Sequence, residues 1–320
     1  MQPKKSLGQH WLFDQEILGE ICAAADVKSG DDVLEIGAGL GTLTAELLRR
    51  GARVWAVELD PALARALPDN VGKILSENLD YTSRKVASDD AYSSSKNFSD
   101  RKTRTAVPAV LKNLTVLNQD FLKLDLSRLP AGYKIVGNIP YYITSPIVKK
   151  ILSVKNRPAV IVLLVQKEVA ARLAAPAGDS ARGASSVLAQ ILADVRLGVK
   201  VSADKFTPPP KVDSQVVILR PRRNFLPDDF FKIVARVVKA GFSARRKKLK
   251  SSLAGGLGID KAAALQILQK SDIDPDARAQ DLTNAQWLNL AKIYAQFSGA
   301  NPAQNFKKSG QVELVNRESK

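Results

Sequence analysis

The apolar residues follow two different patterns, which divide the chain into two regions. Up to about residue 221, short apolar runs typical of buried strands alternate with helical periodicity. The run Asp32–Ile36 leads into a glycine loop, a helix is expected over residues 42–50, and a second strand over residues 54–57. This order is a βαβ unit, so we predict an α/β domain with a largely parallel sheet over residues 1–221.

The same domain contains further predicted elements and one segment that breaks the pattern. A helix is expected over residues 14–26, with Asp14 as its N-cap. The remaining strands are expected at residues 114–117, 133–136, 159–165 and 216–219. Residues 76–106 are rich in Ser, Asp, Lys and Arg, and we interpret them as a polar insertion that is disordered or loosely ordered.

After Pro221 the pattern becomes helical throughout. The expected helices cover residues 228–241, 243–253, 260–269 and 284–297. We therefore predict a small all-α domain over residues 222–298, followed by a polar tail at residues 299–320.

The charge of the chain indicates a polyanionic partner. The 320 residues include 48 Lys or Arg against 32 Asp or Glu, a net charge of +16, which favours a polyanion such as nucleic acid or an acidic membrane surface. Residues 220–250 alone hold 11 Lys or Arg and two Asp, a net charge of +9. We interpret Arg245, Arg246, Lys247 and Lys248 as part of a helix that follows an RNA backbone. A solvated face is the alternative, and the lack of a broad apolar face disfavours a membrane helix.

The scarcity of two residue types excludes several kinds of chemistry. Cys22 is the only cysteine and His10 the only histidine, so an internal disulfide and a cysteine-based zinc site are excluded, and we expect no metal. No stretch reaches the roughly 18 apolar residues of a membrane span. The first eight residues lack the apolar segment of a signal peptide, so we expect a cytoplasmic protein.

A glycine-rich loop follows the first predicted strand. In Glu35-Ile-Gly37-Ala-Gly39-Leu-Gly41, the glycines let the backbone turn sharply and approach a ligand closely. A dinucleotide fingerprint requires a third glycine at position 42, where Thr42 stands. The spacing therefore favours a ligand without a pyrophosphate, and a structural loop or a nicotinamide site remains an alternative.

Two carboxylates stand at the ends of later strands. Glu58 could accept hydrogen bonds from both hydroxyls of an unphosphorylated ribose, whereas Asp60, directly before Pro61, fits a helix N-cap better. Asp120 could accept from an adenine amino group, with Asp125 as the fallback and a plain loop aspartate as the alternative. Together with the glycine loop, these residues predict a nucleoside site.

The segment Val136-Gly-Asn138-Ile139-Pro140-Tyr141 ends another predicted strand. The Asn138 side-chain oxygen and the Ile139 carbonyl could accept both N–H groups of an adenine N6, turning its lone pair toward an electrophilic methyl. Pro140 would stiffen the turn and Tyr141 would offer a face for the base. No general base is needed, and a strand-end turn with a packed tyrosine is the alternative.

A proline-rich loop supplies a second aromatic candidate. In Phe206-Thr-Pro-Pro-Pro-Lys-Val-Asp-Ser214, three prolines make a stiff extended loop that could hold Phe206 opposite Tyr141 as a clamp on a flipped base. The alternative is a core phenylalanine that anchors the loop.

Six blocks of the sequence resemble the ribosomal RNA adenine dimethyltransferases, and among them the bacterial enzymes that act on 16S rRNA. They are Leu7-Gly-Gln-His-Trp-Leu12, Glu35 to Gly41, Glu58-Leu-Asp60, Gly137-Asn-Ile-Pro-Tyr-Tyr142, Gln166-Lys-Glu-Val169 and Phe206 to Ser214. The resemblance departs at Trp11, where phenylalanine is usual, and at Arg182-Gly-Ala-Ser-Ser-Val187, where Tyr-Gly and a Leu-Ser-Val run are usual.

The resemblance implies a Rossmann-like, seven-stranded domain that depends on S-adenosylmethionine, with a small helical C-terminal domain. It implies cofactor contacts at His10, Leu12, Gly37, Glu58, Asp120 and Asn138. It also implies dimethylation of two adjacent adenosines in a hairpin near the 3′ end of 16S rRNA, within the assembling 30S subunit. We expect the chain to act as a monomer.

Two other functions remain open at this point. The chain could be a non-catalytic RNA-binding factor in ribosome assembly or transcription that kept the fold, although the intact Asn138, Pro140 and Tyr141 argue against this. It could also be an enzyme that methylates adenines of DNA or of 23S rRNA.

Overall fold

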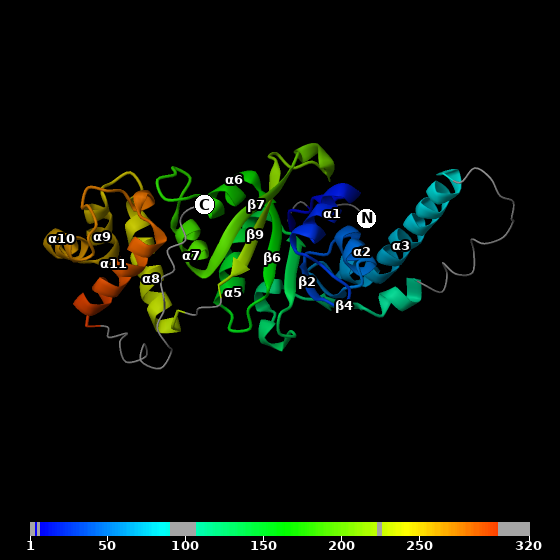
Figure 1. The fold of residues 1–320 in the computed structure, drawn as a ribbon, viewed down its shortest axis with the longest axis horizontal. Helices are drawn as coiled ribbons and strands as arrows, with labels where there is room; N and C mark the ends of the chain where they lie inside the picture. The colour runs from blue at the N-terminus through cyan, green and yellow to red at the C-terminus, as the bar shows by residue number, and fades with distance from the viewer. Residues whose placement is uncertain (1–3, 5–6, 90–106, 223–225, 300–320) are drawn as a thin grey trace. The chain divides into compact units, whose positions relative to one another are not determined.

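The computed structural model describes Lys4 and residues 7–89, 107–222 and 226–299, with the backbone alone for residues 78–89. The chain forms two compact units, which are described separately (Figure 1). The first comprises residues 1–170 and 195–221, and the second comprises residues 171–194 and 222–320.

A seven-stranded sheet forms the centre of the first unit, in the order β4-β3-β2-β5-β6-β9-β7. Its strands are β2 (Asp32–Ile36), β3 (Arg53–Glu58), β4 (Leu114–Asn118), β5 (Lys134–Asn138), β6 (Val160–Gln166), β7 (Ala193–Val201) and β9 (Ser214–Pro221). The neighbours from β4 to β6 pair in parallel, and β9 pairs antiparallel with β6. The predicted Rossmann-like fold is confirmed, and the carboxyl ends of β2 to β5 meet at one edge, where such sheets bind ligands.

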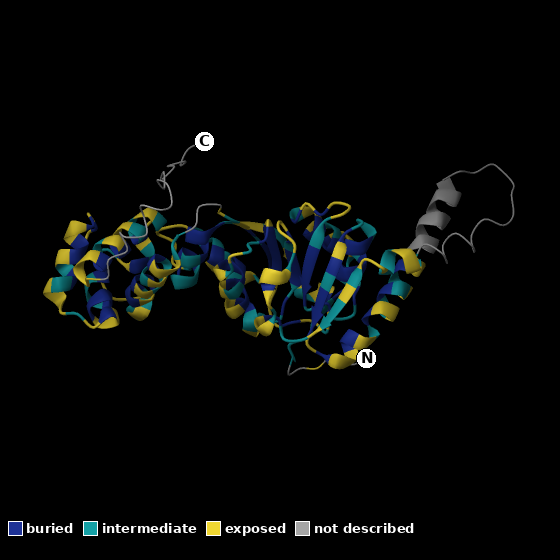
Figure 2. Cartoon of the chain, turned by 90° about the horizontal axis from the view of Figure 1, so that it is seen from below, coloured by how far each residue is buried: buried dark blue, intermediate teal, exposed yellow. Residues whose placement is uncertain are grey.

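The first unit also contains helices and short elements. They are α1 (Gln15–Ala24), α2 (Thr42–Arg49), α3 (Pro61–Asp89), α5 (Thr144–Ser153), the start of α6 (Lys167–Ala174), whose residues from 171 on belong to the second unit, the paired strands β1 (Trp11–Leu12) and β8 (Phe206–Thr207), and the 3₁₀ turns η2 (Phe121–Lys123), η3 (Leu126–Arg128), η4 (Tyr141–Ile143) and η5 (Ala203–Lys205). One hydrophobic cluster joins α1, α2 and α3 to the sheet, with Leu18, Leu47 and Leu67 packed against residues such as Val33 and Val54. Most residues of the central strands are accordingly dark blue in Figure 2, and exposed residues occur on helices, loops and the outer strands.

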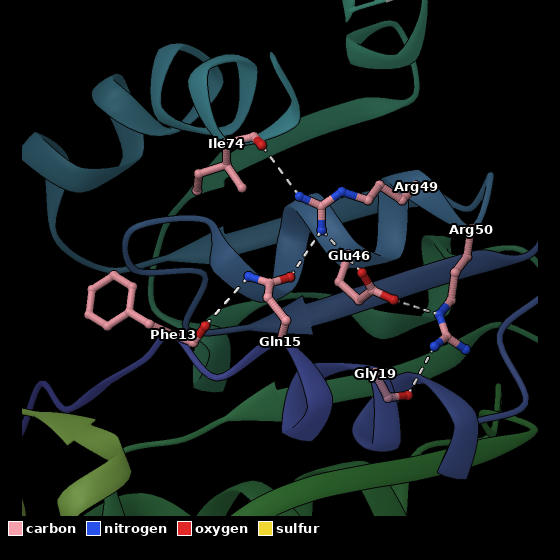
Figure 3. A network of polar contacts seen from close by, with 7 residues as sticks. All are labelled: Phe13, Gln15, Gly19, Glu46, Arg49, Arg50 and Ile74. Carbon is pink, nitrogen blue, oxygen red and sulfur yellow. Dashed lines mark hydrogen bonds and ion pairs between the residues drawn. The ribbon is translucent and has the colours of Figure 1, made fainter. Parts of the chain in front are cut away.

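Polar contacts link α2 to α1 and to α3 (Figure 3). Glu46 pairs with Arg49 at 3.1 Å and with Arg50 at 3.0 Å. The Arg49 guanidinium reaches Gln15 of α1 and the Ile74 carbonyl of α3, while Arg50 donates to the Gly19 carbonyl at 3.0 Å. Because α1 directly follows β1, this network also fixes the segment that carries His10 and Trp11.

The second unit is helical. Its elements are α7 (Ala184–Leu192), α8 (Asp228–Gly241), η6 (Phe242–Ala244), α9 (Leu249–Leu257), α10 (Lys261–Lys270), η7 (Ala279–Asp281) and α11 (Asn284–Phe297). Its own core contains the fully buried Trp287 together with Val237, Leu253 and Leu268. None of the helices in the described parts of either unit combines the length and the hydropathy needed to cross a membrane.

The predicted domain boundary is wrong for one segment. Residues 171–194 were placed in the first domain, but they belong to the helical unit. Val187 of α7 lies in the core of that unit, and the buried Arg182 donates to Asn284 of α11 at 2.6 Å. The sequence pattern did not reveal this because the segment is separated from residues 222–298 by β7 and β9.

Two predicted element boundaries also need correction. Residues 76–89 are not loosely ordered, because α3 continues through them to Asp89; residues 90–106 lie outside the described residues. The helix expected at residues 243–253 begins only at Leu249, because Lys248 has extended backbone angles at its N-cap. Residues 245–248 therefore form a turn between η6 and α9. The predicted tail at residues 299–320 lies outside the described residues except Gly299.

Candidate active site

A cleft lies at the carboxyl edge of the sheet and is lined by residues 7–12, 35–40, 42–43, 57–59, 119–121 and 138–143, together with Leu18 and Ile21 of α1. The predicted residues that line it are His10, Leu12, Gly37, Gly39, Glu58, Asp120, Asn138, Ile139, Pro140 and Tyr141. Four strand ends and the N-terminal segment thus converge on one site, as parallel-sheet topology requires.

The glycine loop between β2 and α2 has two roles. Gly39 has a φ angle of +57° and faces the cleft, where a Cβ would stand 3.4 Å from the Trp11 ring. Gly41 has a φ angle of +90°, and a Cβ there would lie 2.6 Å from Val71 of α3. The loop therefore leaves room for a ligand on one side and lets α3 pack closely on the other.

Glu58 is aimed at this loop from the end of β3. Its carboxylate accepts from the backbone N–H of Gly39 at 2.8 Å and from that of Asp60 at 2.8 Å. Asp60 instead caps the start of α3 by accepting from the Ala62 N–H at 3.0 Å, as the sequence suggested. A carboxylate offers about four lone-pair sites, so two remain for donors in the cleft.

Of the two aspartates considered after β4, Asp120 is the one at the cleft. It also caps η2, accepting from the Leu122 N–H at 2.8 Å. Asp125 does not line the cleft; it caps η3 through the Ser127 N–H and pairs with Arg128 at 3.3 Å. The geometry therefore favours Asp120 over the fallback.

The side-chain amide of Asn138 is oriented by the N-terminal segment. Its Nδ2 donates to the His10 carbonyl at 2.9 Å. Since a carbonyl only accepts hydrogen bonds, the nitrogen must face His10 and the Oδ1 atom must face the other way. The backbone carbonyl of Ile139 has no recorded hydrogen bond within the described part of the chain, so both predicted acceptors remain available.

The proline-rich loop positions His10 and Tyr141. His10 Nδ1 donates to the Pro208 carbonyl at 2.7 Å, and its ring stacks on Tyr141 with centroids 5.8 Å apart. At the other end of the loop, Ser214 bonds the Tyr141 hydroxyl at 2.7 Å. Burial raises the pKa of Tyr141, so its phenol is neutral at physiological pH. One face of Tyr141 is thus covered and its edge is anchored.

Phe206 does not form the predicted clamp. Its side chain is only 2% exposed, lies in the hydrophobic core of the first unit and does not line the cleft. The pairing of β8 with β1 places Phe206 opposite Leu12, which directs the ring inward. The core phenylalanine, considered as the alternative, is what the structure shows.

The four cations predicted to bind RNA are all exposed, but they differ in their contacts. Arg245 donates to the carbonyls of Ser180 and Arg182 at 2.9 and 3.0 Å. Lys248 pairs with Asp276 at 2.7 Å. The side chains of Arg246 and Lys247 have no hydrogen bond or ion pair with another described residue. They lie on a turn and not on the predicted helix face, because α9 starts at Leu249.

Sequence reasoning missed three aromatic residues of the cleft, Trp11, Phe121 and Tyr142. Tyr142 is 61% exposed, Phe121 is buried, and the Trp11 ring lies next to Gly39 of the glycine loop. Each stands next to a residue that the motifs singled out, so adjacency was the available signal. Elsewhere, the residues that the structure describes contain no cluster of three or more His, Cys, Asp or Glu side chains suited to a metal ion.

Comparison with known proteins decides the family. A family model described as ribosomal RNA adenine dimethylase matches residues 1–101 and 74–296. The chain belongs to the ribosomal RNA adenine dimethylase family. The predicted enzyme class, an rRNA adenine dimethyltransferase that depends on S-adenosylmethionine, is thereby confirmed at the level of the family.

Relatives of this dimethylase chain cover nearly its whole length. Proteins named ribosomal RNA small subunit methyltransferase A from Nostoc sp. and Synechocystis sp. are 36% and 37% identical, and each match covers 92% of this chain and 98% of the relative. A dimethyladenosine transferase from Plasmodium falciparum has a TM-score of 0.67 at 26% identity, covering 91% of this chain and 98% of that one. The 23S rRNA methyltransferase ErmE has a TM-score of 0.60 at 26% identity, covering 88% and 98%.

Proposed function

We propose that the protein transfers methyl groups from S-adenosylmethionine to N6 of two adjacent adenosines near the 3′ end of 16S rRNA, in the assembling 30S subunit. The small-subunit relatives, similar over nearly their whole length, support this target over 23S rRNA. The catalytic geometry is carried by one observation, the fixed orientation of the Asn138 amide. The monomeric state and the cytoplasmic location stay predictions.

The cleft fits the cofactor. Gly37 and Gly39 present backbone without a Cβ, which gives a nucleoside a close approach. Glu58 keeps acceptor capacity for ribose hydroxyls, and Asp120 lies at the same wall for an adenine amino group. Leu12 is buried and adds apolar surface. When bound there, S-adenosylmethionine supplies an electrophilic methyl group on a sulfonium.

The strand end beyond β5 would hold the target adenine. In the first transfer, Asn138 Oδ1 and the Ile139 carbonyl each accept one N–H of N6, which moves the nitrogen from planar toward tetrahedral geometry and frees its lone pair. In the second transfer, the methylated nitrogen keeps one N–H for one of these acceptors. The Asn138 amide keeps its orientation because its nitrogen donates to the His10 carbonyl, and rotation of the amide would break that hydrogen bond. The rate gain comes from positioning the nucleophile, and no general base is required for the attack.

Tyr141 would support the everted base from one side. His10 covers one of its faces, and the Ser214 hydroxyl holds its edge, so a base would stack on the opposite face. Because Phe206 is in the core, the proposed pocket has one aromatic wall from this pair and not two. A base taken out of its stack gains from such an aromatic surface.

The target can be tested with particles that lack the modification. Unmethylated 30S particles, 16S rRNA free of protein and 23S rRNA are each incubated with the protein and methyl-labelled S-adenosylmethionine, and the nucleosides are analysed by mass spectrometry. The proposal predicts labelled N6,N6-dimethyladenosine in 16S rRNA from 30S particles. Dimethyladenosine in 23S rRNA alone would overturn the target, and absence of any label despite RNA binding would favour a non-catalytic assembly factor.

A further inference from the structure

Lys150 of α5 holds the turn η2, which follows β4. Its Nζ atom donates to the backbone carbonyl of Leu122 at 2.8 Å and to that of Leu124 at 2.6 Å. Leu122 lies within η2, and Leu124 is its C-cap. The ammonium group also lies 5.7 Å from the centre of the Phe121 ring. One side chain of α5 thus contacts the turn at three consecutive points of its length.

This turn forms part of the cleft wall. Asp120 and Phe121 both line the cleft, whereas Lys150 does not. Asp120 Oδ1 accepts from the Leu122 N–H at 2.8 Å, and the Leu122 carbonyl accepts from Lys150. The other carboxylate oxygen of Asp120, Oδ2, takes no part in this cap. Lys150 is therefore connected to the Asp120 carboxylate through a single residue.

Lys150 gives up part of its hydration for these contacts. Its side chain is half-buried, and this burial lowers the pKa of Lys150, while the carboxylates of Asp120 and Asp125 act in the opposite direction. A lysine ammonium normally stays in water and keeps its rotamer freedom. Lys149, its neighbour in α5, is exposed. The helix thus offers two lysines of equal charge, of which Lys150 is the one that contacts η2.

A similar pair of hydrogen bonds holds the next turn, η3. Asn156 Nδ2 donates to the carbonyl of Leu126 at 3.1 Å and to that of Leu129 at 2.8 Å. Neither Asn156 nor any residue of η3 lines the cleft. Loss of the Asn156 contacts therefore loosens the same stretch of chain without touching the cleft wall, which makes Asn156 a matched control for Lys150.

We infer that Lys150 is a positioning residue of the cofactor site: by fixing η2, it holds Asp120 Oδ2 where it accepts from the adenine amino group of S-adenosylmethionine. The inference rests on the proposed function, in which Asp120 makes this contact. Because Lys150 does not line the cleft, its effect on binding must act through Asp120.

Two ligands separate this role from a general loss of stability. S-adenosylhomocysteine carries the adenine amino group, whereas S-inosylhomocysteine has an oxygen in its place. Dissociation constants are measured by calorimetry for the wild type, Lys150→Met, Lys149→Met and Asn156→Ala. Lys150→Met keeps an unbranched side chain but has no donor, so it should weaken S-adenosylhomocysteine binding about fivefold or more and leave S-inosylhomocysteine binding unchanged. The two control variants should change neither affinity by more than about twofold.

A double-mutant cycle tests the same route without the analogue. In an Asp120→Ala background, Lys150→Met should change the S-adenosylhomocysteine affinity by less than about twofold, because the group through which it acts is gone. An unchanged affinity in Lys150→Met alone, equal losses for both ligands, or a loss that persists without Asp120 would overturn the inference. If the wild type bound no S-adenosylhomocysteine, the proposed function would fail as well.

Discussion

Glu35 is a fully buried carboxyl group between the sheet and α2. It is 1% exposed, and its only recorded hydrogen bond within the described residues is from the Thr44 hydroxyl at 2.6 Å. Burial raises its pKa, the Thr44 hydrogen bond opposes this rise, and the charge of the nearby Glu58 adds to it, so that the pKa of Glu35 is about 8. At neutral pH the folded protein therefore holds Glu35 largely protonated.

The pH dependence follows from this shift. Below pH 4.5 both the folded and unfolded states hold the proton, and between pH 4.5 and about 8 only the folded state does. The stability contributed by this group is therefore present at low pH and is lost as the pH rises through 8. Glu35→Gln should raise the melting temperature by about 3 °C or more at pH 8, with a gain that shrinks toward pH 4.5. Calorimetric melting across this range checks it, and a gain independent of pH would contradict it.

At the residue scale, the sequence predicted those site residues whose positions follow from the order of the strands and from the spacing of the motifs. Asn138 and Glu58 end strands of a recognisable βαβ pattern, so their convergence follows from topology. Phe206 was placed wrongly because its direction depends on the pairing of β8 with β1, two two-residue strands far apart in the chain. The sequence could not predict that the indole N–H of Trp11 is buried without a hydrogen-bond partner among the described residues, because this depends on which atoms surround it in the fold.

At the element scale, two adjacent glycines of α9 have opposite surroundings. A Cβ on Gly256 would lie 2.5 Å from the Ala240 Cα atom of α8, whereas a Cβ on Gly255 would have no heavy atom within 4 Å. Helices α8 and α9 therefore approach each other at Gly256.

This pair gives a matched test of helix packing. Gly256→Ala forces the two helices apart and should lower the free energy of unfolding of the helical unit by about 2 kcal/mol. Gly255→Ala only improves helix propensity and should raise the free energy of unfolding by up to about 1 kcal/mol. Urea unfolding followed by circular dichroism measures both. Equal effects of the two substitutions would show that α8 and α9 are not in contact there.

Long periodic elements were predicted better than those set by distant contacts. The helices α8 and α11 and the strand β2 have the predicted bounds, because each has a clear apolar periodicity and defined ends. The start of α9 was missed, because the charged run 245–250 has good helix propensity but Lys248 is extended. The long α3 was not predicted, and its last part, residues 76–89, was interpreted as an insertion, because a polar sequence with few apolar residues does not distinguish a solvated helix from a loop.

At the scale of the whole molecule, the net charge of +16 predicts RNA binding that weakens steeply with salt. The structure refines which cations to test. The side chains of Arg246 and Lys247 are exposed and contact no described residue through a hydrogen bond or ion pair, whereas Lys248 and Lys250 both pair with Asp276. That double ion pair lowers the pKa of Asp276 to about 2.

Charge reversal at these positions tests the RNA contact. Arg246→Glu combined with Lys247→Glu should weaken RNA binding and make the slope of log affinity against log salt shallower by about 1.5, since each lost phosphate contact removes about 0.7–0.9. Lys261→Glu combined with Lys270→Glu, two exposed cations at the ends of α10, changes the net charge by the same amount and is the control. Titrations at several salt concentrations give the slopes. A slope equal to that of the control variant would contradict the assignment.

Methyl transfer, as proposed, depends on the Asn138 amide oxygen, which His10 orients and which accepts a hydrogen bond from the amino group of the target adenine. Single-turnover methyl transfer and S-adenosylhomocysteine affinity are therefore measured together for the wild type and Asn138→Ala. We expect a transfer rate at least about 100-fold lower, as for loss of a preorganised polar group, with cofactor affinity changed by less than about threefold. A variant that transfers methyl groups at the wild-type rate, or whose slow transfer is restored by saturating cofactor, would contradict it.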